Sequence, residues 1–331
     1  MCKINNRLAK ITEKLGQWLI LALCAGAISS SALLAEDWDI ENTGQPFTEV
    51  DITLSEGTWM SVDVSPDGTS LVFDLLGDLF IMPASGGEAR LLTGGAAIDR
   101  TPSFSPDGTQ ILYLSDRSGD DDVWVINIDG TGAKPLTNST STMLANPAWT
   151  PDGTYFAVAS VDKGFRTQKT SELRLFHRAG GSGETLVPAP ENKRDIQEPE
   201  FSSDGTYLYY TKRLVDHHIF VNANHVNYGI LRKNLHTGET ETLIKGFGGA
   251  LTPQLSPNDK RLAFVRRVKQ KTVLFVYNLE TGEQRPVYDE LDRDQQADFY
   301  LQGVYYPQYD WFPDNVHVAI WGKGKLFKVN M

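Results

Sequence analysis

Cysteine is nearly absent from this chain of 331 residues, which contains only Cys2 and Cys24. Both lie within the first 35 residues, where four basic residues precede the apolar run "WLILALCAGAI" and the small residues of "SSSALLAED". This order is typical of a secretory signal peptide. We therefore expect residues 1–35 to be removed, with cleavage after Ala32 or Ala35. The mature chain would then have no disulfide and no thiol nucleophile.

Long hydrophobic runs are also missing. The apolar run of the leader is shorter than the roughly 20 residues that a transmembrane helix needs, so an uncleaved anchor is the less favoured alternative. We expect an exported protein, periplasmic or extracellular, with no membrane insertion after leader cleavage. The formal net charge is −11, and loss of the basic leader makes the chain more acidic. Such a chain repels phosphates, which argues against a nucleic-acid partner.

The usual signatures of catalysis and nucleotide binding are lacking. The sequence has no G-x-S-x-G elbow, no P-loop and no Rossmann glycine fingerprint. We therefore expect no catalytic residue and no cofactor within this chain. Its one cluster of histidines is "VDHHIFVNANH", where Asp216, His218 and His225 are the candidate metal ligands. Adjacent histidines on a strand point to opposite faces, which favours a polar loop over a metal site.

What the sequence does contain is one turn repeated six times. The copies are "SPDG" at 65–68 and 105–108, "TPDG" at 150–153, "SSDG" at 202–205, "SPND" at 256–259 and "FPDN" at 312–315. Their second positions, 40 to 56 residues apart, are Pro66, Pro106, Pro151, Ser203, Pro257 and Pro313. Proline presets φ at the second position, and glycine accepts the positive φ that leads into the next strand. Each copy therefore predicts a hairpin.

Each turn is followed by two β-rich runs, a second turn with glycine, and a short strand such as "ARLLT" or "AKPLT". Repeats of this length with four strands predict propeller blades, whereas helical solenoids would show a 3.6-residue period. The predicted fold of residues 36–331 is an all-β six-bladed β-propeller. Its last repeat has only three strands, so we expect the strand-like segment 47–55, "FTEVDITLS", to complete the last blade and close the ring.

The stretch "SPDGTQILYLSDRSGDDDVWVINIDGTGAKPLT" resembles the repeat of TolB-type propellers, and the match recurs over the mature chain. Two longer stretches, "EGTWMSVDVSPDGTSLVFDLLGDLFIMPASGGEARLLTGG" and "LAFVRRVKQKTVLFVYNLETGEQRPVYDELDRDQQ", are similar to the N-terminal propeller of large exported amidohydrolase-family proteins. In that family a metal-dependent hydrolase domain with a His-x-His pair follows the propeller. This sequence has no His-x-His, so the resemblance implies hydrolase activity only for a further C-terminal domain.

A binding surface is the better expectation for this chain. In propellers the loops between the second and third strands and the connectors between blades open on one face, and here these segments differ in length. The connector "ELDRDQQADFYLQGVYYP" combines arginine with tyrosine, as interface anchors do, although its aromatic rings would also suit packing between blades. The predicted binding residues at the channel mouth are Trp59, Asp99, Arg100, Arg117, Arg293, Tyr305 and Tyr306.

The predicted function is therefore that of an exported binding or substrate-gating module. By resemblance, it is the non-catalytic N-terminal part of an amidohydrolase-like protein, whose partner is the missing catalytic domain. The alternative is a stand-alone cell-envelope propeller, related to TolB, that binds a protein or peptide.

Overall fold

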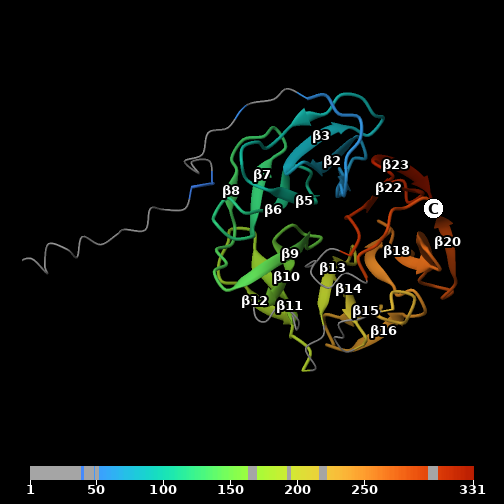
Figure 1. Ribbon diagram of the computed structural model, residues 1–331. Helices are drawn as coiled ribbons and strands as arrows, with labels where there is room; N and C mark the ends of the chain where they lie inside the picture. Colours follow the sequence, from blue (N-terminus) through green and yellow to red (C-terminus); the bar gives the residue numbers. More distant parts are fainter. Residues whose placement is uncertain are drawn as a thin grey trace, which may run out of the picture. The chain divides into compact units, whose positions relative to one another are not determined.

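The six repeats form six antiparallel sheets arranged in a ring, as the computed structural model shows (Figure 1). The structure describes residues 39–40, 48, 52–162, 170–191, 195–215, 222–296 and 305–331. All of them belong to one compact unit that begins at Asp39. The predicted signal peptide lies outside the described residues. Within the described ranges, no helix combines the length and the hydropathy that a membrane span requires.

Five blades have four strands and the sixth has three. The first two blades contain β1 (Val62–Val64), β2 (Ser70–Leu75), β3 (Asp78–Pro83), β4 (Arg90–Leu91), β5 (Asp99–Phe104), β6 (Gln110–Ser115), β7 (Asp122–Asn127) and β8 (Lys134–Pro135). The next two contain β9 (Thr142–Trp149), β10 (Tyr155–Asp162), β11 (Ser171–His177), β12 (Glu184–Val187), β13 (Ile196–Phe201), β14 (Tyr207–Arg213), β15 (Tyr228–Asn234) and β16 (Thr240–Ile244). The last two contain β17 (Leu251–Leu255), β18 (Arg261–Val268), β19 (Lys271–Asn278), β20 (Gln284–Tyr288), β21 (Asp310–Trp311), β22 (His317–Gly322) and β23 (Lys325–Asn330).

The repeated turn joins the first and second strands of every blade, as predicted. In the second blade the Gly108 amide donates to the Ser105 carbonyl at 2.8 Å, and Gly108 has φ of +69°. The Asp107 carboxylate accepts from the Ser105 hydroxyl at 2.6 Å and from the Thr109 amide at 3.0 Å. The turn therefore satisfies its own polar groups, which explains why the same residues recur.

The middle strands of each blade are apolar on both sides because each blade packs between two others. Along β6, Ile111 and Tyr113 face a cluster shared with the first blade, whereas Leu112 and Leu114 face one shared with the third. Alternating side chains thus fill two different cores, so the strand reads as a continuous apolar run.

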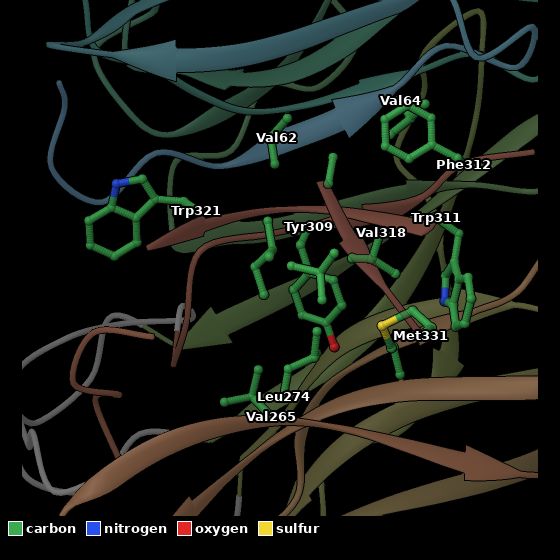
Figure 2. Packing of buried hydrophobic residues seen from close by; sticks show 14 of the residues in the cluster. Val62, Val64, Val265, Leu274, Tyr309, Trp311, Phe312, Val318, Trp321 and Met331 are labelled. Atoms are coloured by element: carbon green, nitrogen blue, oxygen red, sulfur yellow. The ribbon is translucent and has the colours of Figure 1, made fainter. Parts of the chain in front are cut away.

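The seam between the sixth and first blades closes the ring through side chains (Figure 2). Val62 and Val64 of β1 pack in one cluster with Val318 and Trp321 of β22. Trp321 Nε1 donates to the Gly57 carbonyl at 2.9 Å, and the Gly57 amide donates to the Gly324 carbonyl at 2.8 Å. This apolar cluster, which extends to the fifth blade, joins the sixth blade to the first.

The predicted fourth strand of the last blade is not present in the described part of segment 47–55. Residues 52–54 form no strand, and the last sheet ends at β23 among the described residues. Ile52 and Leu54 are instead 61% and 48% exposed, and both line a pocket near the start of β1. Residues 47 and 49–51 of the segment lie outside the described residues.

Candidate functional site

The ring has two faces, which differ in the loops that form them. The turn face carries the six turns between first and second strands. The connector face carries the turns between second and third strands and the connectors from one blade to the next. Two pockets adjoin the innermost strands, one on each face, and are named here the turn-face cavity and the connector-face pocket.

The connector-face pocket has a volume of about 660 Å³ and is formed by the first three blades. Its walls are largely apolar, from Leu75 of β2 to Met143 of β9. Large apolar side chains also stand at its rim: Leu76 is 74% exposed and Ile98 53% exposed. A concave apolar surface with exposed apolar rim residues is typical of a binding site.

Polar groups at fixed positions interrupt these walls. Asp74 is buried and accepts from the Ser61 and Thr101 amides, each at 2.8 Å, while burial raises its pKa to about 6. Arg100 pairs with Asp121 at 2.9 Å. The Asp99 side chain is fully buried, and one of its oxygens accepts from Arg117 at 2.7 Å. The pocket therefore offers charged groups that can orient a ligand.

The turn-face cavity has a volume of about 500 Å³ and is lined by residues from all six blades. Four carboxyl groups line it, those of Asp63, Glu198, Glu200 and Asp310. Asp63, Glu200 and Asp310 each stand two residues before the repeated turn in their own blades. No lysine, arginine or histidine is among the described residues that line this cavity. The sequence analysis did not identify these three carboxyl groups, although their common position in the repeat was a usable signal.

Each of these three carboxyl groups accepts a backbone amide of the following blade. Asp63 accepts from the Phe104 amide at 2.6 Å, Glu200 from Leu255 at 3.2 Å and Asp310 from Val64 at 3.3 Å. Burial is the main cause that raises the pKa of all three. The pKa of Asp310 rises to about 6 and that of Glu200 to about 8, and the pKa of Asp63 lies well above its ordinary value.

Comparison with known proteins agrees with this geometry. Residues 59–219 match the family model of the tricorn protease N-terminal beta propeller domain. The chain is 28% identical over 160 residues to the protein TolB homolog of Chlorobium chlorochromatii, covering 48% of this chain and 31% of that protein. The solved structure of a putative TolB from Agrobacterium tumefaciens superimposes with a TM-score of 0.59 at 17% identity, covering 82% of this chain and 88% of that chain.

The chain is a TolB-like six-bladed β-propeller. The tricorn protease structure has the same fold over 83% of this chain but only 25% of its own, with a TM-score of 0.61 at 15% identity. The TolB-like propeller spans about half or less of the length of the curated relatives it matches.

Three of the predicted binding residues of the TolB-like propeller, Trp59, Asp99 and Arg100, line the connector-face pocket. Arg117 lies beside them, where it donates to Asp99 and to the Gly94 carbonyl at 2.9 Å. Asp74 of the same pocket was missed, since nothing in its strand "SLVFDL" distinguishes a buried carboxylate from an exposed one.

The other predicted binding residues of the propeller lie elsewhere. Tyr306 is buried at the seam and also lines the turn-face cavity, with its ring 6.0 Å from Trp59 and its hydroxyl donating to the Trp321 carbonyl at 2.9 Å. Tyr305 is buried 4.5 Å from the Tyr228 ring. Both therefore pack between blades, which was the alternative interpretation of this aromatic connector. Arg293 is exposed on the connector and does not line either site.

Of the three candidate metal ligands, the structure describes His225. Asp216 and His218 lie outside the described residues, and His225 is exposed with its ring 6.0 Å from Phe247. Where the chain is described, no three side chains of the metal-ligating types come together.

Proposed function

We propose that this TolB-like propeller is an exported binding module whose connector face recognises a protein or peptide segment bearing apolar side chains. The observation that carries the proposal is the connector-face pocket with its rim. The rim residues Ile52, Leu76 and Ile98 are each more than half exposed, which costs free energy in water unless a partner covers them.

The polar groups of the pocket suit recognition of a peptide. Arg100 and Asp121 form a partly exposed ion pair at the wall and can exchange partners with backbone or charged groups of a bound segment. Asp74, buried and already accepting from two amides, fixes the shape of the wall. An apolar pocket with a few fixed polar groups is the usual form of a specific site.

The similarity to TolB proteins supports the form of this proposal in which the propeller acts on its own in the cell envelope. The tricorn protease supports the second form, a non-catalytic part of a larger hydrolase, because there the matching propeller is a quarter of the chain. The amidohydrolase association rests only on the resemblance of the two quoted stretches.

Site-directed cross-linking tests the proposal. Because cysteine is confined to the leader, Cys2→Ser and Cys24→Ser leave a chain into which one cysteine can be placed. Leu76→Cys, at the rim, carries a photoactivatable maleimide, and Val316→Cys, 38% exposed on the turn face, is the matched control. We expect a discrete cross-linked partner from envelope fractions at position 76 and none at 316. Equal labelling at both positions, or none at either, would refute the proposal.

The intact mass of the native polypeptide separates the two forms. A mass near that of the printed sequence less its leader supports a propeller acting alone. A mass several times larger supports the non-catalytic part of a hydrolase, and the cross-link from position 76 should then form within one polypeptide.

A further inference from the structure

The connector-face pocket carries more negative than positive charge. Its described lining residues include four carboxyl groups, those of Glu56, Asp74, Asp99 and Asp121, whereas Arg100 is the only cation among them. The Arg100 charge is already paired, because its guanidinium lies 2.9 Å from the Asp121 carboxylate. An apolar pocket with a surplus of carboxyl groups favours a ligand that brings a positive charge with it.

Two of these carboxyl groups lack a full set of partners. Asp99 is fully buried, and its Oδ2 accepts from Arg117 at 2.7 Å, but among the described residues its Oδ1 has no hydrogen-bond partner. Glu56 lies 3.9 Å from Lys325, where both side chains are more than half exposed, so water screens this pair. A buried carboxylate oxygen without a donor costs free energy, and a cation supplied by a ligand would reduce that cost.

The rim of the pocket has a leucine where equivalent turns have lysine. Leu76 and Gly77 form the two-residue turn between β2 and β3, and Leu76 has φ of +55° with its side chain 74% exposed. In the other two-residue turns between second and third strands, this positive-φ position is occupied by Lys269 and Lys323. A leucine with positive φ costs free energy, and its exposure adds to that cost, so contact with a partner would stabilise it.

We propose that the connector-face pocket selects a segment in which a lysine or arginine side chain is flanked by apolar side chains of a protein partner. This inference rests on the proposed function and names the chemistry of its partner. The apolar side chains cover Leu76 and Ile98 at the rim, and the cation lies at the wall, where it shares the Asp121 carboxylate with Arg100. An acidic segment would meet the surplus of carboxyl groups and is rejected.

Three fluorescent peptides of the form Leu-X-Leu, capped at both ends, test this preference. The central residue is lysine, glutamine or glutamate, so the peptides differ mainly in charge. In fluorescence anisotropy titrations with the full chain, the lysine peptide should bind at least about tenfold more tightly than the glutamine peptide, as a charge-assisted hydrogen bond provides. The glutamate peptide should bind more weakly than the glutamine peptide. The preference for lysine should decrease as the salt concentration rises.

Asp121→Asn is the decisive variant, because the Asp121 side chain is 18% exposed and lies at the pocket wall. We expect it to fold and to bind the lysine and glutamine peptides nearly equally. Asp289→Asn removes the same charge from an exposed ion pair with Lys271 in the fifth blade, and this control should keep the parental preference. Arg100→Gln removes the competing cation and should increase the preference for lysine. A parental preference in Asp121→Asn, or an unchanged or smaller one in Arg100→Gln, would overturn the inference.

Leu76→Asn separates this inference from the proposed function. Asparagine accepts the positive φ of Leu76 and removes the exposed apolar side chain without a change of charge. Equal binding of the three peptides by the parent, lost in Leu76→Asn, would overturn the charge preference and leave the apolar site in place. Binding of none of the peptides would also overturn the inference, and cross-linking at positions 76 and 316 then decides whether the proposed function fails with it.

Discussion

The two faces of the ring differ in the side chains that they expose. On the turn face, an aspartate recurs at the third position of the repeated turn and accepts hydrogen bonds within that turn. Hydrogen bonds from Ser105 and Thr109 lower the pKa of Asp107 to about 2, and those from Ser202 and Thr206 do the same for Asp204. The connector face carries most of the large apolar side chains that are exposed: Ile52, Leu54, Leu76, Ile98, Phe247 and Val268. The polar groups of the repeated turns on the turn face have partners within the turns. The connector face, whose loops vary, exposes apolar side chains that a partner could cover.

Truncating the seam core should have the largest effect on stability. Trp321 is 4% exposed, contacts Trp59 and Tyr306, and donates to Gly57. Trp321→Ala should lower the free energy of unfolding by about 3–5 kcal/mol, as expected for a buried tryptophan. Phe247→Ala on the connector face, where the side chain is 76% exposed, is the control and should change it by less than about 0.5 kcal/mol. Urea unfolding of both variants measures the difference.

Two equivalent glycines of the turn face should differ because one lies at the seam. Gly68 and Gly108 have φ of +72° and +69°. An added Cβ at Gly68 would lie 2.8 Å from Pro313 across the seam, whereas at Gly108 it would lie 3.6 Å from Pro66. Gly108→Ala should cost about 1–2 kcal/mol from φ alone, and Gly68→Ala should cost about 1 kcal/mol more. Equal urea midpoints for Gly68→Ala and Gly108→Ala would mean that the seam accommodates the added Cβ with no loss of stability.

The buried carboxyl groups of the turn-face cavity should make the stability of the protein fall as the pH rises. Burial raises the folded-state pKa of Glu200 to about 8, above the unfolded value near 4.3. The stabilisation from its protonated form is therefore complete below about pH 4.3 and is lost as the pH approaches 8. Glu200→Gln keeps an acceptor for the Leu255 amide, so it should exceed the parent in stability by about 1–3 kcal/mol at pH 8 and match it at pH 4. Thermal unfolding of the parent and of Glu200→Gln at both pH values measures this difference. If the stability of both proteins has the same pH dependence, Glu200 does not cause the loss of stability at high pH.

The exposed turn acids should give the smallest effect, with the opposite pH dependence. The pKa of Asp107 is lowered, so its contribution is present above its ordinary pKa and disappears as the pH falls towards 2. Asp107→Asn should lower the Tm at pH 7 by about 1–2 °C and have no effect near pH 2. A larger loss at pH 7 would mean that Asp107 does more than cap its own turn.

Sequence could predict the features of the fold that depend on neighbouring residues. The six turns need proline, aspartate and glycine at fixed offsets, so the fold and the strand order followed from counting them. Features that depend on contacts between residues distant in the chain were harder to predict from the sequence. Residues 52–54 matched part of a fourth strand in pattern but form no strand, since a pattern cannot show where a segment lies. Tyr305 and Tyr306 have the composition of a binding surface, yet they pack between blades.

The candidate sites were predictable to different degrees. Trp59, Asp99 and Arg100 were found because connectors of a propeller must open on one face. The carboxyl groups of Asp63, Glu200 and Asp310 were missed because other blades have serine, alanine or glutamine at the equivalent positions, Ser103, Ala148 and Gln254. Only the closed ring brings these scattered positions together.

Every sheet of the ring consists of strands that follow one another in the chain. Each blade can therefore pair its described strands as soon as its own 40 to 56 residues are available. A chain that becomes available N-terminus first can thus fold progressively, blade by blade, with little unpaired strand exposed at any moment. The one event that must come last is the docking of the sixth blade onto the first.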